Sequence, residues 1–380
     1  MREYKICKRC IMDTSDPEIA FYENGYCNHC SKALKLLNTP PVSLSPEEKE
    51  KSLNTLVDKI KADGKNKKYN CIIGVSGGVD STYAAYLVKK NGLNPLAVHL
   101  DNGWNSRIAV TNIEKTLKKL DIDLYTHVID WEEFKDLQLS FLKASTPDSE
   151  VPSDHAITAL LYKIAAKHHV KYILAGTNIT SESILPKAWS QGHSDWKYIR
   201  SLQRKFGTAR LTTFPHYSIL GLFYYIVICK TKFISILNYV NYAKEDAKKI
   251  LINELGWEDY GGKHHESIYT HFYQSHILPR KFGFDKRRAH LSSLIMAGQI
   301  TREAAIEEMK TPAISEEMAR SEEEYVISKF NLTRESYDKI MNAPVKSFHD
   351  YPSYFNSFYY KFFFKIYKAL GIFGVRKSDI

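Results

Sequence analysis

The sequence has few cysteines and no apolar stretch long enough to cross a bilayer. Six cysteines among 380 residues argue against a fold held by disulfide bonds in a chain of this size. The longest apolar run lies within residues 216–240 and ends at Lys230, so it predicts a buried or subunit-interface helix rather than a transmembrane one. The first residues lack the apolar segment of a secretory signal. We therefore expect a globular protein of the cytoplasm.

Two common nucleotide-binding motifs, Walker A and Gly-x-Gly-x-x-Gly, are also missing, but another glycine-rich loop is present. Residues 69–75 form an apolar run of strand length, and a helix pattern begins at Ser81. The loop consists of Ser76, Gly77, Gly78, Val79, Asp80 and Ser81. Because N–H groups at a helix start point at a ligand and glycine lets the backbone approach it, this arrangement predicts a phosphate site.

The loop pattern Ser-Gly-Gly-x-Asp-Ser resembles the pyrophosphate loop (PP-loop) of the ATP pyrophosphatase superfamily. Members of that superfamily cleave ATP between the α and β phosphates and leave an adenylated intermediate. An ordinary glycine turn between a strand and a helix is the alternative. Asp80 beside a phosphate requires a cation, most simply Mg²⁺ held by one or two carboxylates and phosphate oxygens. The predicted cofactors of this loop are therefore ATP and Mg²⁺.

A second motif follows the apolar run at residues 172–175. Gly176 and Thr177 begin a Gly-Thr-x-x-x-x-Glu pattern that ends at Glu182. The spacing resembles the ammonia-dependent NAD synthetases of the same superfamily, in which the matching Glu shares the metal with the loop Asp. The resemblance implies that Glu182 is the second Mg²⁺ ligand and that Gly176 and Thr177 line the ATP site. A surface carboxylate is the alternative for Glu182.

Four of the six cysteines form two Cys-x-x-Cys pairs within residues 1–40, namely Cys7, Cys10, Cys27 and Cys30. Four thiolates at this spacing surround one Zn²⁺ tetrahedrally, and the metal supplies stability that forty residues cannot obtain from a core. We predict a structural zinc ribbon, with a redox dithiol pair as the alternative. The remaining Cys71 and Cys229 are interpreted as small buried apolar side chains.

The rest of the chain predicts an α/β fold: a parallel sheet with helices on both faces, of the adenine nucleotide alpha hydrolase-like (PP-loop) class. The zinc ribbon precedes it and a mostly helical region follows. The predicted segments are a linker with a charged helix (41–68), the PP-loop domain (69–215), a helical substrate or partner region (216–310) and a helical aromatic-basic extension (311–380).

Two further positions fall at the carboxyl edge of the expected sheet, where ligands bind in such folds. Asp101 and Asn102 follow a strand-like run and are candidates to line the adenosine pocket, with a plain Asn-Gly turn as the alternative. Ser153 or Asp154 is expected to cap a helix at about residues 155–168.

The formal charge of +10 indicates an anionic partner: nucleic acid, a membrane surface or an acidic small substrate. Aromatic residues make up 13% of the chain, and the tail at residues 354–374 mixes Phe and Tyr with Lys. Basic aromatic helices dock on membranes or on partner proteins. Packing of this tail on the body of the same chain is the alternative.

Several motifs together resemble the N-acetyl sugar amidotransferases of bacterial surface-polysaccharide biosynthesis. They are the paired cysteines followed by Met12-Asp13-Thr14, the PP-loop, Gly176-Thr177-Asn178, Lys263-His264-His265-Glu266-Ser267, Lys281-Phe282-Gly283 and Lys286-Arg287-Arg288-Ala289-His290-Leu291. The resemblance implies ATP-dependent conversion of a sugar acetamido group to an acetamidino group through an adenylated intermediate, with release of AMP and pyrophosphate.

Roles for individual residues follow from that resemblance. Lys263 and Lys187 are candidates to neutralise phosphate charge, and Glu266 or His264 to orient the substrate or move a proton. The chain has no glutaminase signature, so ammonia is expected from a separate glutaminase subunit, with a barrel-like, cyclase-type partner as one route of delivery. The substrate is expected to be an N-acetylated acidic sugar, either nucleotide-linked or a nonulosonic acid.

Two other functions compete with this one. A tRNA-thiolating PP-loop enzyme suits the basic charge, but it normally needs reactive cysteines near the adenylate, and both pairs here are assigned to zinc. A non-enzymatic ATP-binding module of a membrane complex is the other. The expected location is the cytoplasm, or the inner face of the membrane if the tail docks there.

Overall fold

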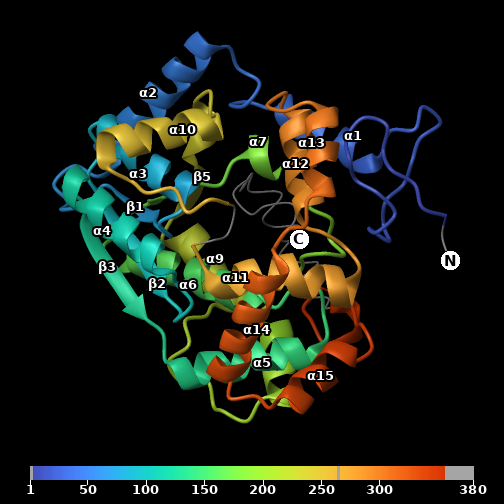
Figure 1. The fold of residues 1–380 in the computed structure, drawn as a ribbon. Helices are drawn as coiled ribbons and strands as arrows, with labels where there is room; N and C mark the ends of the chain where they lie inside the picture. Colours follow the sequence, from blue (N-terminus) through green and yellow to red (C-terminus); the bar gives the residue numbers. More distant parts are fainter. Residues whose placement is uncertain (1–2, 263–265, 356–380) are drawn as a thin grey trace.

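A five-stranded parallel sheet forms the centre of the described chain, which comprises residues 3–262 and 266–355 of the computed structural model (Figure 1). The strand order is β3-β2-β1-β4-β5, so the chain builds outward in both directions from β1. The strands are β1 (Cys71–Gly74), β2 (Pro95–Asp101), β3 (Asp123–Val128), β4 (Tyr172–Ala175) and β5 (Lys232–Ser235). The order reverses between β1 and β4, and in such sheets ligands bind at the carboxyl ends of the strands beside this point.

Helices connect the strands and continue beyond them. Those of the first half are α1 (Asn28–Leu37), α2 (Pro46–Asp63), α3 (Val79–Lys90), α4 (Arg107–Leu120), α5 (Trp131–Ala144), α6 (Val151–Lys167), α7 (Ile179–Glu182) and α8 (Trp196–Phe206). Those of the second half are α9 (Ile219–Phe223), α10 (Lys244–Ile250), α11 (Ile268–Phe272), α12 (Arg287–Met296), α13 (Arg302–Lys310), α14 (Glu316–Lys329) and α15 (Arg334–Asn342). π-helical turns are η1 (Tyr224–Ile228), η3 (Leu251–Leu255) and η4 (Tyr273–Phe282), and 3₁₀ turns are η2 (Ile236–Tyr239) and η5 (Phe348–Asp350).

The two faces of the sheet are covered by different helices because side chains alternate along each strand. On β1, Ile73 packs into the core that contains α2, α3, α4 and α10, whereas Ile72 packs into the core that contains α5 and α6. Both side chains are fully buried. The predicted α/β fold with helices on both faces is thus confirmed.

The apolar run at residues 216–240 does not form the single buried helix that we expected. It contains the short α9, the turn η1 and then the edge strand β5, which pairs with β4 from Tyr172↔Lys232 to Ala175↔Ser235. Lys230 has a positive φ of 55°, which ends the helical path before the strand. Leu220 and Ile228 are 65% and 62% exposed. The sheet therefore draws its fifth strand from beyond residue 215.

The start of α6 also differs from the expectation. The helix begins at Val151, its N-cap is Glu150, and neither Ser153 nor Asp154 caps it. Pro152 in the first turn fits this earlier start, because a helix start is the one helical position that tolerates proline. The side chains of Ser153 and Asp154 are instead used in contacts between elements, described below.

Two expectations concern membranes. Within residues 3–262 and 266–355, every helix is too short or too polar to cross a bilayer. Residues 356–380, which make up most of the tail predicted to contact a membrane or a partner, lie outside the described residues.

Candidate functional site

The PP-loop connects β1 to α3 in a fixed shape. Gly77 has a φ of +80°, and a Cβ there would lie 2.4 Å from the carbonyl oxygen of Ala109 on α4, so only glycine fits. The hydroxyl groups of Ser76 and Ser81 lie 3.1 Å apart, and Ser81 Oγ also accepts the N–H of Ser76 at 3.2 Å. Ser81 Oγ donates to the carbonyl of Gly78, which is the N-cap of α3. The two serines thus tie the ends of the loop together.

Two tyrosines from distant parts of the chain contact this loop. The hydroxyl of Tyr260 accepts the N–H of Val79, the first residue of α3, at 3.2 Å. The hydroxyl of Tyr242 donates to the carboxylate of Asp80. Burial raises the pKa of both phenols, with Glu266 adding to the effect at Tyr260 and Asp80 at Tyr242. The neutral hydroxyl of Tyr260 thus accepts an N–H at the start of a helix. In anion-binding sites, such N–H groups donate to phosphate oxygens.

The second motif lies directly against the loop. A Cβ on Gly176 would come within 2.5 Å of the backbone carbonyl of Asp80 and 2.7 Å of the nitrogen of Ser81, so β4 ends in close contact with the first turn of α3. Thr177 shares a hydrogen bond of 2.6 Å with Ser235 at the end of β5. Glu182 is the last residue of α7 and is exposed. Both predicted Mg²⁺ ligands, Asp80 and Glu182, therefore lie on elements at the carboxyl edge of the sheet.

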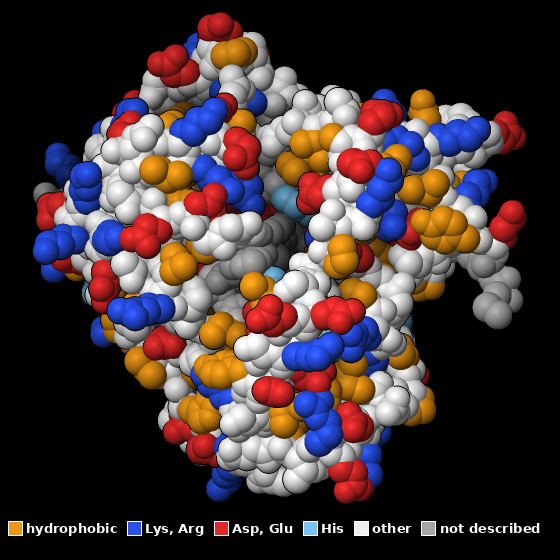
Figure 2. Space-filling model, in the orientation of Figure 1, with side chains coloured by type: hydrophobic (Ala, Val, Ile, Leu, Met, Phe, Trp, Pro, Cys, Tyr) orange, Lys and Arg blue, Asp and Glu red, His pale blue; other side chains and the backbone are white. Residues whose placement is uncertain are grey.

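Glu266 reaches the loop from the C-terminal region. Its carbonyl accepts the N–H of Ser106 at 2.9 Å, and residues 104–106 and 266–268 lie antiparallel through the Asn105↔Ser267 bridge. Its carboxylate Oε1 lies 3.6 Å from the position that a Cβ on Gly78 would take. Figure 2 shows the molecule hollowed at its centre, between the part that carries α10 and the part that carries α12 and α13. Glu266 thus lies beside the phosphate loop.

Two of the predicted catalytic residues, Lys263 and His264, lie outside the described residues. Lys187 is half-buried in the segment between α7 and α8, where its carbonyl accepts the N–H of Ser190. Neither its position nor its contacts test the phosphate-neutralising role, which stays a prediction.

Asp101 and Asn102 form a turn at the end of β2. The carboxylate of Asp101 accepts the N–H of Gly103 at 2.9 Å, and Gly103 has a φ of +80°. Asn102 donates to the hydroxyl of Ser153 at 3.2 Å, which links this turn to the start of α6. The Asn-Gly turn is therefore present and lies at the edge predicted to bind the nucleotide, and its role in an adenosine pocket stays a prediction.

A cluster of charged side chains that the sequence reasoning missed surrounds Lys286. Its ammonium nitrogen is 3.9 Å from the carboxylate of Glu150. Burial opposes the charge on Lys286, but the carboxylates of Asp148, Glu150, Asp154 and Glu182 raise its pKa. These residues come from three separate stretches of the chain, so no local spacing indicated that the stretches meet.

The carboxylates of this cluster differ in their acidity. Burial raises the pKa of Glu150 to about 7, although Lys286 opposes the shift. Burial also disfavours the charged form of Asp148, but His193, 3.2 Å away, together with Lys286 and Ser190 outweighs that effect and brings the pKa down to about 2. Gln274 donates to Glu150 at 2.7 Å. Glu150 is thus a mostly buried carboxyl that exchanges its proton near neutral pH.

The four N-terminal cysteines meet as predicted. They are buried and unbridged, their sulfurs all lie within 4.8 Å of one another, and three of the sulfur pairs are 3.7 Å apart. A tetrahedral Zn²⁺ with Zn–S bonds of about 2.3 Å places its sulfurs about 3.8 Å apart, so the set fits a closed zinc site. The N–H groups of Arg9 and Met12 donate to Cys7 and Cys10, which favours thiolates.

Of the two other cysteines, Cys229 is half-buried rather than buried as predicted, and Cys71 does not supply a reactive thiol at the loop. Cys71 begins β1, at the end of the strand opposite the PP-loop, and it is fully buried. Burial raises the pKa of its thiol. A protonated, inaccessible thiol is inert as a nucleophile. This finding disfavours both a thiolation reaction at Cys71 and a glutaminase nucleophile there.

Comparison with known proteins divides the chain into two matched segments. Residues 48–200 match the NAD synthase family, and residues 266–367 match the family described as LPS biosynthesis protein WbpG-like, C-terminal domain. No curated protein matches the chain. The first match confirms the PP-loop fold expected from the loop, and the second supports the expected link to surface-polysaccharide biosynthesis.

Two solved structures illustrate the likeness. NMN synthetase from Francisella tularensis is 15% identical, with 80% of this chain and 99% of that chain covered and a TM-score of 0.33. The ammonia-dependent NAD synthetase from Campylobacter jejuni, in complex with nitrate, is 17% identical, with 70% and 99% covered and a TM-score of 0.32. At these scores the two structures add nothing to the functional conclusion.

Proposed function

We propose that this ATP-dependent PP-loop enzyme with a lipopolysaccharide-biosynthesis domain is an N-acetyl sugar amidotransferase. It converts an acetamido group of a bacterial surface sugar to an acetamidino group. The observation that carries the proposal is the antiparallel contact of residues 266–268 with residues 104–106, which brings Glu266 beside Gly78 of the PP-loop. The segment that matches the lipopolysaccharide family thus begins at the phosphate loop of the segment that matches NAD synthase.

The reaction has two steps. The amide oxygen attacks the α-phosphorus of ATP, the bond to the β-phosphate oxygen breaks, and pyrophosphate leaves. Ammonia then adds to the activated carbon, AMP departs with the former amide oxygen, and an amidine remains. The first step depends on positioning and on neutralising charge at phosphorus, because an amide carbonyl oxygen is a weak nucleophile. The second step depends on holding ammonia against the activated carbon.

The residues of the loop supply much of that positioning. Ser76 and Ser81 hold the loop in shape, and the N–H of Val79 binds a phosphate oxygen in place of the hydroxyl of Tyr260. When bound, Mg²⁺ neutralises phosphate charge, and Asp80 and Glu182 are the carboxylates that would hold it. Their oxygen donors suit this hard cation.

Proton movement is assigned to carboxylates at the same edge. Glu266, beside the loop, orients the acetamido group or moves a proton there, with His264 as the other candidate. Glu150, whose pKa lies at about 7, accepts the proton released when ammonia adds. A carboxyl that titrates near neutrality serves this purpose better than an ordinary one.

Ammonia comes from a separate glutaminase subunit in this proposal. The support is chemical: Cys71 is buried and its thiol pKa is raised, so it cannot act as the nucleophile that glutamine hydrolysis needs. The isolated chain should therefore work with ammonium salts but not with glutamine. Glutamine-dependent turnover by the isolated chain would contradict this part of the proposal.

An oxygen-labelling experiment tests the proposed reaction. The purified chain is incubated with ATP, Mg²⁺, ammonium chloride and N-acetylated acidic sugars whose acetyl oxygen is ¹⁸O, and the products are analysed by mass spectrometry. We expect the label in AMP and an oxygen replaced by NH in the sugar. Unlabelled AMP, or release of ADP and phosphate, would refute the mechanism. ATP binding without turnover of any sugar would favour the non-enzymatic alternative.

A further inference from the structure

We propose that the zinc ribbon positions the metal-binding edge of the active site through α12, with Arg288 and Arg302 as the positioning residues. The proposal rests on the proposed function only in assigning Glu182 to Mg²⁺·ATP. The ribbon lies beside α12 and α13 (Figure 1), α7 packs against α12, and helix α1 of the ribbon also touches α7. Helix α12 is therefore in contact with both the ribbon and the element that ends in Glu182.

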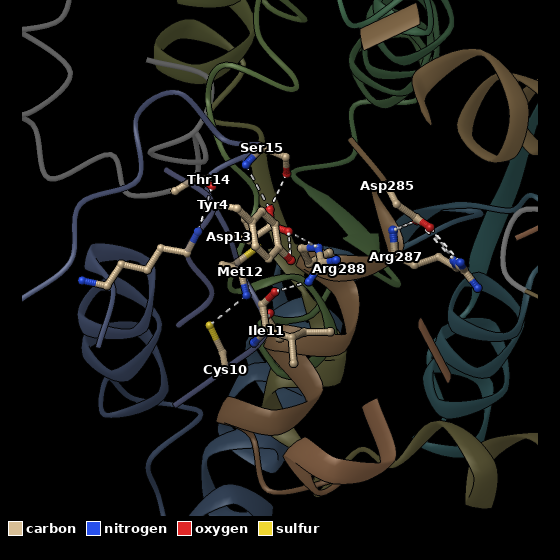
Figure 3. Close-up of polar contacts among 12 residues, drawn as sticks. Tyr4, Cys10, Ile11, Met12, Asp13, Thr14, Ser15, Asp285, Arg287 and Arg288 are labelled. Atoms are coloured by element: carbon tan, nitrogen blue, oxygen red, sulfur yellow. Dashed lines mark hydrogen bonds and ion pairs between the residues drawn. The ribbon is translucent and has the colours of Figure 1, made fainter. Parts of the chain in front are cut away.

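The ribbon side of this contact is dense in hydrogen bonds. Arg302 donates from Nε to the carbonyl of Cys10 and from Nη2 to the carbonyl of Cys7, both at 3.0 Å. Arg288 donates to the carbonyl of Ile11 at 2.7 Å and pairs with Asp13 at 3.1 Å (Figure 3). Each arginine thus contacts backbone carbonyls within residues 7–13, whose positions depend on how the four cysteines are coordinated.

These contacts are shielded from water. The side chains of Arg288 and Asp13 are 16% and 4% exposed, and Ile11 is fully buried against Leu291 of α12 and Ala305 of α13. The N–H of Ile11 also donates to Ser292 on α12. Charge-assisted hydrogen bonds in such surroundings contribute more than exposed ion pairs do. The ribbon is therefore held in one orientation on α12.

Another face of α12 holds α7 and the residues after it. Ser293 accepts the N–H of Ile184 at 2.9 Å, and His290 Nδ1 donates to the carbonyl of Ser181 at 3.1 Å, which fixes the proton on that nitrogen. The carboxylate of Glu182 is one of the charges that raise the pKa of Lys286, the N-cap of α12. The two hydrogen bonds flank Glu182 in the sequence, so a shift of α12 would move that carboxylate.

Paired arginine variants test the inference in the full-length zinc-loaded protein. Arg288→Met and Arg302→Met remove the ribbon contacts, and Arg287→Met is the matched control, because its guanidinium contacts Asp285 and Thr311 instead. Hydrogen exchange of the amides at 179–190, followed by mass spectrometry, is the readout. We expect the two ribbon variants to exchange about tenfold faster there and the control to be unchanged.

Two further measurements keep the outcome interpretable. Zinc content should stay at one equivalent in all three variants, which shows that the ribbon is intact, and the dissociation constant of Mg²⁺·ATP should rise about tenfold in the ribbon variants only. Ser293→Ala should speed exchange at Ile184 without changing exchange in the ribbon. Unchanged exchange at 179–190 in both ribbon variants would overturn the inference. Failure to convert any sugar would instead count against the proposed function, because the exchange measurement does not depend on it.

Discussion

Replacement of Tyr260 by Phe should strengthen ATP binding. The Tyr260 hydroxyl accepts the N–H of Val79 at 3.2 Å, and a phosphate oxygen that binds this N–H must displace it. The variant removes this acceptor of the Val79 N–H. The aromatic ring keeps its edge-on contact with Trp257, with the ring centroids 5.3 Å apart. The cost of breaking the hydrogen bond is thus removed from the binding equilibrium.

The size of the effect follows from the strength of that bond. A neutral hydrogen bond contributes about 0.5–1.5 kcal/mol net, so the dissociation constant of ATP should fall about two- to tenfold. Isothermal titration calorimetry at fixed Mg²⁺ measures it. Tyr86→Phe is the matched control, because that hydroxyl donates to Glu254 and not to the loop. Weaker binding by the Tyr260 variant would refute the reasoning and show that its hydroxyl contacts the bound nucleotide.

Three further predictions concern the same edge. Asp80→Asn should abolish pyrophosphate release in a coupled assay, because the metal loses a carboxylate, and normal turnover would contradict the role of the loop. Gly176→Ala should destabilise the protein by about 1–3 kcal/mol in denaturant unfolding, since its Cβ would lie 2.5 Å from the backbone of Asp80; an unchanged midpoint would be incompatible with that contact. Glu150 must be ionised to accept a proton, so activity of the native enzyme should rise with pH through about 7, and Glu150→Gln should lose that rise. A profile identical in the two proteins would exclude Glu150 as the base.

Short-range patterns of the sequence were sufficient to predict the PP-loop and the cluster of four cysteines. The strand, glycine turn and helix start lie within residues 71–90, and the φ of +80° at Gly77 is a local property of that turn. The two Cys-x-x-Cys pairs likewise predicted the meeting of four sulfurs, because each pair delivers two ligands from one turn. In both places the residues that make the chemistry are close together in the chain.

Other predictions failed because they depended on partners elsewhere. The run at 216–240 is apolar enough for a helix, but pairing with β4 places part of it in the sheet. Ser153 suits a cap by its residue type, but α6 begins earlier and its hydroxyl accepts from Asn102 instead. In both places the local preference of the sequence was outweighed by hydrogen bonds to residues that are distant in the chain.

The sequence by itself therefore determined the shape of the PP-loop and the meeting of the four cysteines, because a turn or a Cys-x-x-Cys pair is specified by a few neighbouring residues. Only the tertiary structure decided what surrounds them. Tyr242 and Tyr260 contact the loop across 162 and 181 residues of chain, and Glu150 meets Lys286, which is also distant in the chain. The type of a residue does not determine how close in space it lies to such a partner, because that distance is set by how the whole sheet and its helices pack.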